Sequence, residues 1–510
     1  MQGASLAADC ASNTLELIPR WTPLRLQRAA AAPTMLHVTW PVRDMGWKTG
    51  VAVTVLGGTL IAVLGPQLTT TAAPERASDS AGLAQVPPSP EPHSGSVSGA
   101  FANVNVPKSE TVSATEPAET PPSAVSEGDH ALAALVHPIP IEDPDGKALK
   151  PFHRALHDLV AGKRDKVRLV FFGASHVASD LFTDVVRRQL QERFGNGGPG
   201  FLLPAKPRRF HYHSRADYQA AEGFKGLQVR VNTPGMERYG LAGVALDAAR
   251  KRRAHAVMQT RAPTGPGNAI SHLTLYYMKQ PRGGHLGVRI DGKRRGRIAT
   301  SFRRKEPGYH EVHIKEGEHQ LQLQTYGDGP VRIFGVALEN DRPGIVVDTL
   351  GVPGARARYQ LQWHQATFRN HLKRRDPALV VLAYGTNEAG DDDVPLSEYE
   401  GQLKAVLRRV KATVPKAACL LIGPSDQPIR DREAGTLSDR PRTLSLVKIQ
   451  RRVAAKYGCG FFDLVALMGG AMTMPAWVEA QLGAQDYIHF TRGGYTFVGE
   501  VLTDALMQGY

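Results

Sequence analysis

The chain has 510 residues and a formal net charge of +14 at pH 7, a length that suits roughly two to four domains. Its 42% hydrophobic content excludes a wholly disordered chain and a membrane protein with many spans. Three cysteines exclude a disulfide-dense scaffold and a cysteine-rich zinc module. The basic charge suggests an anionic partner, such as an envelope polymer or a nucleic acid, although an Arg-rich solvated surface would look the same.

The first apolar segment of the chain follows an N-terminal region, residues 1–49, and spans residues 50–68. Its core, residues 50–65, is uncharged, and Arg43 and Lys48 precede it, which predicts that the C-terminal bulk is exported. A full span needs roughly 20 residues, so this shorter stretch fits a signal peptide or a signal anchor. We expect an uncleaved anchor; the alternative is a buried core helix.

Residues 69–131 are rich in Pro, Ser, Thr, Ala and Glu and poor in large apolar residues. Such a segment cannot bury enough surface to fold, so it is predicted to be a disordered linker. As a flexible coil it would reach roughly 40–50 Å. It would therefore space the rest of the chain from a membrane.

After residue 131 short apolar strands alternate with helical patterns. Strands are expected at residues 167–172, 345–350, 379–384, 418–423 and 460–464. Helices are expected at residues 148–161, 180–194, 357–374, 397–412, 443–456 and 491–508. This alternation predicts an α/β domain with a parallel, doubly wound sheet, built from residues 132–221 and 343–510.

Residues 222–342 interrupt that pattern with period-two alternation, as at Leu273, Leu275 and Tyr277, and with turn pairs such as Asp291-Gly292. Short strands at this spacing predict an inserted β-sandwich. Residues 221–345 carry 21 basic and 11 acidic side chains. The basic clusters at 250–253, 293–297 and 303–305 could hold an anionic glycan or phosphate polymer, or could be a solvated face.

Three motifs follow predicted strands, at the sheet edge where α/β proteins place their sites. Ser175 lies in Gly173-Ala174-Ser175-His176, on a tight turn into a helix whose N–H groups can face an oxyanion. Asn387 lies in a Gly-Thr-Asn-Glu run and offers an amide donor. Asp486 and His489 have the spacing at which a carboxylate orients an imidazole on one turn. Each motif alone has an ordinary structural explanation: a loop serine, an Asx turn, or an unrelated carboxylate and histidine.

Together the motifs supply a nucleophile, an oxyanion donor and an Asp–His base. In this the chain resembles the SGNH (GDSL-type) hydrolase superfamily, whose four blocks centre on Ser, Gly, Asn and Asp-x-x-His. The blocks match Ser175, Gly354, Asn387 and Asp486/His489. Gly351 is the weaker choice for the second block, because it stands at the strand end whereas the family glycine comes a few residues later.

The run Gly-Asn-Gly-Gly-Pro-Gly-Phe at residues 195–201 and the basic insert further resemble bacterial peptidoglycan O-acetylesterases, whose SGNH domain carries a carbohydrate-binding-like module. This resemblance implies a flavodoxin-like, three-layer hydrolase domain. It covers about residues 150–510. Ala174 departs from it, because the family has an aspartate before the serine that helps to shape the nucleophile turn.

The resemblance implies a serine esterase that removes O-acyl groups, such as O-acetyl, from peptidoglycan or another envelope glycan. Ser175, Asp486 and His489 would be catalytic, with Ser175, Gly354 and Asn387 forming the oxyanion hole. An O-acetyltransferase and an inactive, membrane-tethered glycan-binding protein are the alternatives. No cofactor, metal or nucleic-acid partner is expected. The location would be the bacterial cell envelope, periplasmic or exported, with the inner membrane as anchor.

Two further residue sets remain open. His176, beside the nucleophile, is expected to be structural or to face substrate rather than to act as the base. Cys419 and Cys459 lie at or beside two predicted strands. We expect two buried thiols there; the alternative, in an oxidising compartment, is a disulfide.

Overall fold

The computed structural model describes residues 51–56, 59–64, 139–206, 212–229, 237–260, 268–431 and 433–510. It divides into two units, Met1–Thr115 and Glu116–Tyr510. In the first, β1 (Val51–Leu56) and β2 (Thr59–Leu64) pair antiparallel. Among the described residues no helix has the length and apolarity to cross a bilayer. The signal anchor at 50–68 thus stays a prediction, and the linker at 69–131 lies outside the described residues.

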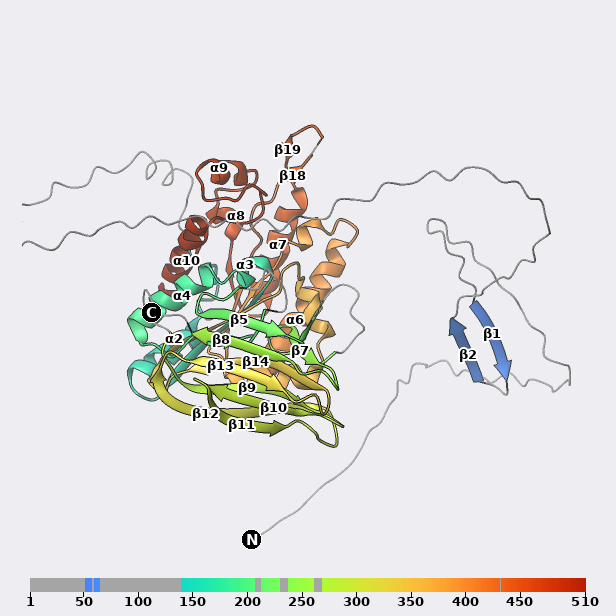
Figure 1. Cartoon of the computed structure of the whole chain (residues 1–510). Coiled ribbons are helices and arrows are strands. Elements are labelled where there is room, and N and C mark those ends of the chain that lie inside the picture. The colour runs from blue at the N-terminus through green and yellow to red at the C-terminus, as the bar shows by residue number, and fades with distance from the viewer. Residues whose placement is uncertain are drawn as a thin grey trace, which may run out of the picture. The chain divides into compact units, whose positions relative to one another are not determined.

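The second unit is drawn in Figure 1 from cyan to red along the chain. It contains a five-stranded parallel sheet in the order β15-β3-β16-β17-β20. In chain order its strands are β3 (Lys166–Gly173), β15 (Gly344–Gly351), β16 (Leu379–Ala383), β17 (Ala418–Ile422) and β20 (Gly460–Phe462). Numbered along the chain the order is therefore 2-1-3-4-5, that of flavodoxin-like folds. The prediction of an α/β domain with a parallel sheet is confirmed.

Helices cover both faces of this sheet because both faces of its strands are apolar. Along β3, side chains alternate between two hydrophobic cores, one on each face of the sheet. Leu169 and Phe171 belong to the first core, and Val170 and Phe172 belong to the second. The first face holds α2 (Lys150–Val160), α4 (Phe182–Phe194), α9 (Met474–Glu479) and α10 (Arg492–Met507). The second holds α5 (Gln365–Arg375), α6 (Leu396–Thr413) and α7 (Pro441–Lys456).

Two predicted helices and one predicted strand have different bounds in the structure. The helix expected at 180–194 begins only at Phe182, because Asp180 has a φ of 51°; a separate turn, α3 (Ser175–Ala178), precedes it. The helix expected at 357–374 is split into a 3-10 helix η1 (Ala357–Gln362) and α5, because Trp363 is extended and His364 caps α5. The strand expected to reach residue 464 ends at Phe462, because Asp463 caps α8 (Leu464–Leu467).

Short elements fill the remaining loops of the hydrolase part. A 3-10 turn η2 (Glu388–Gly390) follows β16. A small hairpin of β18 (Ile429–Arg430) and β19 (Leu437–Ser438) follows β17. None of these was predicted, because each is too short to show a hydrophobic period.

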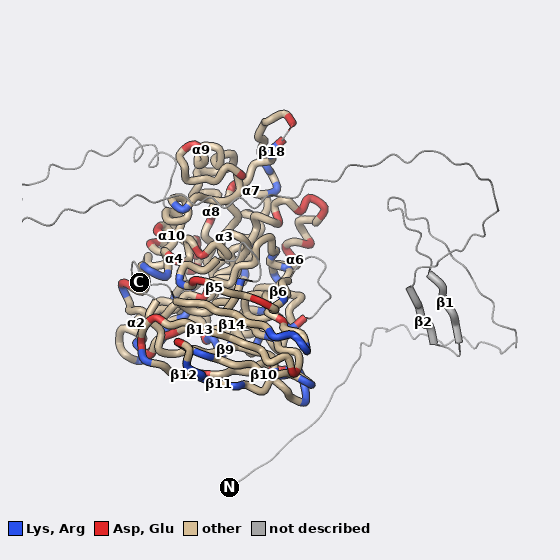
Figure 2. The backbone as a smooth tube through the Cα atoms, viewed as in Figure 1, with Lys and Arg blue, Asp and Glu red and all other residues tan. Residues whose placement is uncertain are grey.

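Two antiparallel sheets lie between β3 and β15 in the sequence. One has the order β11-β10-β13-β8-β5 and the other β12-β9-β14-β7-β6, with β4 paired to β14. Their bounds are β4 (Gly200–Leu202), β5 (Ala216–Glu222), β6 (Lys225–Gln228), β7 (Val244–Ala248), β8 (His255–Thr260), β9 (Ile270–Lys279), β10 (His285–Ile290), β11 (Lys293–Ala299), β12 (Glu306–Gly317), β13 (Gln320–Thr325) and β14 (Val331–Glu339). Antiparallel pairing therefore begins before residue 222. Many Lys and Arg positions of this region lie on its strands (Figure 2).

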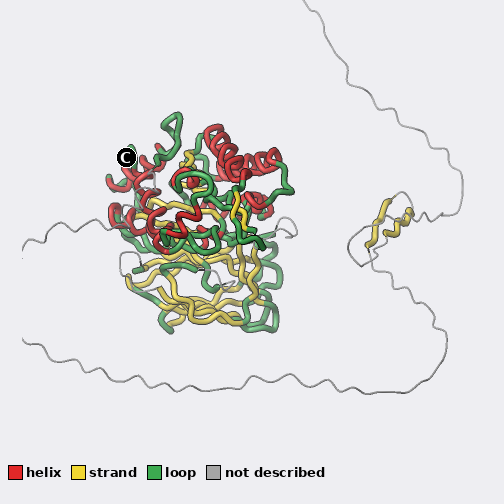
Figure 3. The backbone as a smooth tube through the Cα atoms, turned by 90° about the horizontal axis from the view of Figure 1, so that it is seen from above, coloured by secondary structure: helices red, strands yellow, loops and turns green. Residues whose placement is uncertain are grey.

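The two antiparallel sheets share one core, and the six-stranded sheet has a second buried face. Leu273 and Leu275 point into the shared core with Leu286 and Leu323. On its other face, Tyr276 and Phe334 pack near His371 of α5, at ring distances of 5.5 and 5.0 Å. The antiparallel region is thus packed against the hydrolase helices, and seen from above the helices gather on one side of it (Figure 3).

Cys419 and Cys459 form a disulfide, so the expectation of two free thiols is wrong. Leu420 of β17 pairs with Gly460 of β20, which places the preceding residues, the two cysteines, opposite each other. Their Cα atoms are 4.6 Å apart, within the range that a disulfide spans. The sequence places the two cysteines at or beside predicted strands, but it does not give the register that brings them together.

Candidate active site

The candidate site lies where three loops leave the same edge of the parallel sheet. Gly173, the last residue of β3, pairs with Gly351 of β15 and with Ala383 of β16. The loops that carry Ser175, Gly354 and Asn387 therefore start side by side. They start at the point where the strand order reverses, which is where open α/β sheets place their sites.

The predicted nucleophile and base are in direct contact. His489 Nε2 lies 2.8 Å from Ser175 Oγ, and His489 Nδ1 lies 2.7 Å from Asp486 Oδ2. Asp486 Oδ1 also accepts the backbone N–H groups of Ile488 (3.0 Å) and His489 (2.9 Å). The three side chains form one line of hydrogen bonds that joins the start of α3 to the loop before α10.

The electrostatics of this line favour an ionised aspartate. Partial burial alone would raise the pKa of Asp486, but the hydrogen bonds from the His489 ring and from two backbone N–H groups outweigh it and lower the pKa. The Asp486 side chain is 49% exposed and that of His489 is 36% exposed. A carboxylate held in this way accepts from His489 Nδ1 and leaves Nε2 to take a proton from Ser175.

The second and third blocks lie in two loops that are bound to each other. Gly354 is exposed, has a φ of +75°, and has open space around its Cα. Asn387 Nδ2 donates to the Ala355 carbonyl at 3.0 Å, which leaves its second N–H free for another acceptor. Gly351, by contrast, is packed so tightly that an added Cβ would lie 2.1 Å from the Ala178 nitrogen. Of the two candidate glycines, Gly354 is thus the one open to a ligand.

Glu388 joins these two loops from beneath. Its carboxylate accepts the N–H of Ala357 at 2.8 Å and the N–H of Gly385 at 3.0 Å. Burial raises the pKa of Glu388. On the solvent side, Arg356 donates to the Gly354 carbonyl at 2.8 Å and pairs with Asp391. The positions of Gly354 and Asn387 are therefore fixed from both sides.

His176 lies next to His489, but both of its ring nitrogens have partners outside the Ser175–His489 pair. Its Nδ1 lies 2.9 Å from Tyr495 Oη and its Nε2 lies 3.4 Å from Ser425 Oγ. Burial, followed by the nearby His489, lowers the pKa of His176 to about 3. A ring that stays neutral and is bonded to Tyr495 supports the neighbouring His489 and does not compete as a base, as the sequence suggested.

Ala174 lies at the N-cap of α3 and makes no side-chain hydrogen bond there. An aspartate at an N-cap would accept from the first free N–H groups of the turn, so this chain lacks one tether on its nucleophile turn. Ala174 and His176 instead line a mostly apolar cavity of about 30 Å³, whose wall includes Tyr495 and Phe490.

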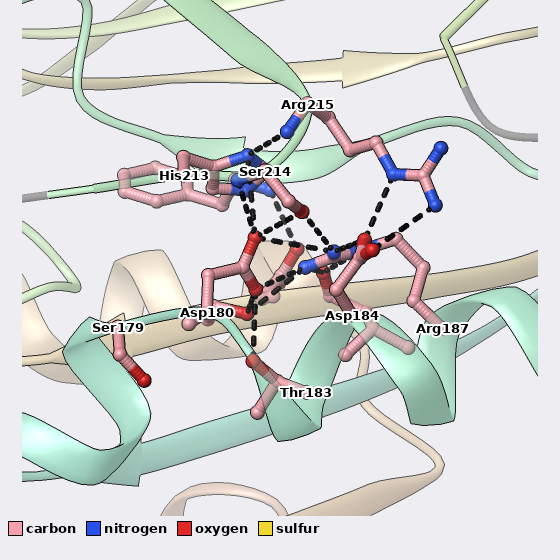
Figure 4. A network of polar contacts seen from close by, with 12 residues as sticks. Ser179, Asp180, Thr183, Asp184, Arg187, His213, Ser214 and Arg215 are labelled. Carbon is pink, nitrogen blue, oxygen red and sulfur yellow. Dashed lines mark hydrogen bonds and ion pairs between the residues drawn. The ribbon is translucent and has the colours of Figure 1, made fainter. Parts of the chain in front are cut away.

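A buried network on the other end of α3 holds the same turn (Figure 4). Asp180 is fully buried, and its carboxylate accepts from Arg187 Nη2 (2.9 Å), Ser214 Oγ (2.6 Å) and Thr349 Oγ1 (2.6 Å). Burial opposes ionisation of Asp180, but the Arg187 guanidinium and these bonds outweigh it and hold its pKa below the ordinary carboxyl value. The network ties the serine turn to β15 and to the residues that lead into β5.

Sequence reasoning missed Asp180, Glu388, Tyr495 and Ser425 as supports of the site. Each reaches a partner far away in the chain; Thr349, for example, is 169 residues from Asp180. Nothing in one sequence marks such partners. Glu388 is the exception in part, because it stands in the same motif as Asn387 and accepts the N–H of Gly385 there; its other donor, Ala357, lies 31 residues away.

Comparison with known proteins agrees with this geometry. The family model for GDSL-like lipases and acylhydrolases matches residues 319–497. That range holds Gly354, Asn387, Asp486 and His489. Ser175 lies before it in the sequence, separated from it by most of the antiparallel strands. The structure brings Ser175 back to the matched residues. No protein in the curated set matches the chain.

One solved structure, of a peptidoglycan O-acetylesterase, is 25% identical to this chain with a TM-score of 0.60. The match covers 72% of this chain and 98% of that chain, which is more than the hydrolase segments alone, so it includes antiparallel strands. Family two carbohydrate esterases from Clostridium thermocellum and Cellvibrio japonicus also match. They are 11% identical, cover 58% and 57% of this chain and 98% of their own, and have TM-scores of 0.24 and 0.23.

A serine–histidine–aspartate line at the switch point of a 2-1-3-4-5 sheet, in a chain that matches this family model, defines the class. The family-model match over residues 319–497 and the structural match to a peptidoglycan O-acetylesterase support the SGNH (GDSL-type) hydrolase superfamily. Within that superfamily it is a serine esterase, and it resembles peptidoglycan O-acetylesterases.

Proposed function

We propose that this esterase removes O-acyl groups, with O-acetyl as the simplest case, from a cell-envelope polysaccharide such as peptidoglycan. The observation that carries the proposal is the 2.8 Å contact of Ser175 Oγ with His489 Nε2, in a chain whose fold matches a peptidoglycan O-acetylesterase over 98% of that protein. Acyl-ester hydrolysis follows from the class; the polymer and the roles of individual residues are the proposal.

In the first step, Ser175 Oγ attacks the ester carbonyl while His489 Nε2 takes its proton. The carbonyl oxygen becomes an oxyanion, which the N–H groups of Ser175 and Gly354 and the free N–H of Asn387 stabilise. Asp486 holds the imidazole in the correct tautomer and stabilises its charged form. The ester C–O bond then breaks, and His489 gives the proton to the departing sugar oxygen.

In the second step, water attacks the acyl group on Ser175 and His489 takes a proton from that water. The acyl–Ser175 bond breaks, Ser175 regains its proton from His489, and a small carboxylic acid such as acetate leaves. Ser175 and His489 are both partly exposed, so water reaches the acyl-enzyme. This exposure favours hydrolysis over transfer to a second sugar hydroxyl.

We place the enzyme outside the cytoplasm, in the cell envelope. The Cys419–Cys459 disulfide supports this location, because such bonds persist in oxidising compartments and are rare in the cytosol. We also propose that the two antiparallel sheets form a β-sandwich that binds the polysaccharide. Residues 50–68 would attach the chain to the inner membrane through the linker at 69–131.

The test is acetate release from O-acetylated peptidoglycan by the full chain, beside Ser175→Ala and the matched control Ser397→Ala on the exposed side of α6. We expect release by the wild type and by Ser397→Ala and none by Ser175→Ala. Hydrolysis of p-nitrophenyl acetate without acetate release from peptidoglycan would contradict the polymer assignment. Folded protein with no Ser175-dependent hydrolysis of either substrate would favour a binding protein without activity.

A further inference from the structure

The antiparallel region contains a pocket that no step of the hydrolysis uses. It has a volume of about 380 Å³ and lies at the ends of β6, β7, β9 and β14, next to Lys305. Its lining also includes Pro330 and the almost fully buried Met278 and Val331. A volume of this size falls in the range of small-molecule sites.

The pocket carries an excess of positive charge. Lys225, Arg252 and Lys305 line it, are exposed, and make no ion pair in the part of the chain that the structure describes. The lining carboxylate, Asp247, pairs with Arg332 at 2.7 Å, and Arg332 pairs also with Glu237 at 2.7 Å. Together with Arg332 the three exposed cations make four cations against two carboxylates, Asp247 and Glu237, so the pocket keeps an excess of positive charge.

The position of the pocket relates it to the active site. Met278 and Arg332 lie on the face of the six-stranded sheet that also holds Tyr276 and Phe334, and this face packs against the hydrolase helices. Gly243, just before β7, packs against Val352 in the loop of Gly354. From there β7 leads to Asp247 and Ala248 in the pocket, a distance of roughly 13 Å at strand spacing.

We propose that this pocket binds carboxylate groups of the polysaccharide whose ester is cleaved at Ser175. The proposal rests on the proposed function and names how the polymer is held. Peptidoglycan strands carry carboxylates on their peptide stems, and a long polymer can reach the pocket and Ser175 together. Lysine and arginine ends bind carboxylates through charge-assisted hydrogen bonds.

The experiment compares two triple variants of the full chain. Lys225→Gln/Arg252→Gln/Lys305→Gln removes the three pocket cations. Lys293→Gln/Arg294→Gln/Arg295→Gln removes the same charge from β11, the edge strand of the other sheet, where these residues are exposed. Binding to insoluble peptidoglycan is measured by co-sedimentation, and p-nitrophenyl acetate hydrolysis reports the catalytic site.

The pocket variant should bind peptidoglycan about tenfold or more weakly, with p-nitrophenyl acetate hydrolysis unchanged, while the β11 variant binds as the wild type does. When the carboxylates of peptidoglycan are converted to amides, the pocket variant and the wild type should bind it equally weakly. Mild base, which removes O-acetyl groups, should leave binding intact. These arms assign the binding to carboxylates rather than to the ester.

Equal binding by the pocket variant and the wild type, equal loss in both variants, or full binding to amidated peptidoglycan would each overturn the proposal. So would wild-type protein that does not bind peptidoglycan. Failure of the proposed function looks different: peptidoglycan is bound through the pocket, but no acetate is released from it.

Discussion

The Cys419–Cys459 disulfide should contribute substantially to the stability of the hydrolase domain. It closes a loop with a sequence separation of 40 residues, and the chain-entropy model gives about 4 kcal/mol at 25 °C for a loop of that length. Both cysteines are 2% exposed, so the reduced form would also have to pack two thiols where the bond now lies. The loss on reduction should therefore be about 4 kcal/mol or more.

The assay compares oxidised protein with protein that has been unfolded, reduced and refolded in reductant, so that the sequence is the same in both. Urea titration should show a lower midpoint for the reduced form, and the free energy of unfolding follows from midpoint and slope. Thiol titration in denaturant without reductant should find one free thiol of the three cysteines, that of Cys10. Three free thiols, or equal midpoints for the two forms, would refute the reasoning.

Three further changes test the supports of the site. Asn387→Asp keeps the shape of the side chain but removes the donor, so kcat on p-nitrophenyl acetate should fall about 10²–10³-fold; an unchanged kcat would exclude Asn387 from the oxyanion hole. Asp180→Asn breaks a buried pair with Arg187 and should lower the free energy of unfolding by about 3–5 kcal/mol at pH 7. The pKa of Asp180 is lowered on folding, so its contribution is present above the ordinary carboxyl pKa and is lost as the pH falls toward the lower pKa of the folded state. The difference between wild type and variant in urea titrations should therefore begin to narrow below about pH 4; a difference that does not narrow there would contradict this. Glu388→Gln leaves one of two buried N–H groups without an acceptor, which should cost about 1–3 kcal/mol of stability and lower kcat; a variant equal to the wild type in both measurements would show that Glu388 does not fix the two loops.

Much of the parallel sheet could be predicted from the sequence, because its strands are buried on both faces. Runs such as Val380, Val381 and Leu382 of β16 are apolar without interruption, and that signal survives in a single sequence. The breaks in helices could not be predicted. They depend on local backbone states, such as the positive φ of Asp180, that an amphipathic pattern does not encode.

The candidate site likewise contains residues that the sequence predicts and residues that it does not. Ser175, Asn387, Asp486 and His489 stand in short motifs at strand ends, and parallel strands bring such ends together. Gly354 could be chosen over Gly351 only with the family pattern in hand, and its open surroundings agree with that choice. The Asp180 network and the disulfide depend on register and on contacts across the fold, which the sequence does not reveal.

The central claim is that Ser175 carries the acyl group during the reaction. The most direct measurement is mass spectrometry of the protein after acid quench during turnover of p-nitrophenyl acetate. The account predicts one added acetyl group on the peptide that contains Ser175, and none on Ser175→Ala treated in the same way. An acetyl group on another residue, or turnover by Ser175→Ala at the wild-type rate, would contradict it.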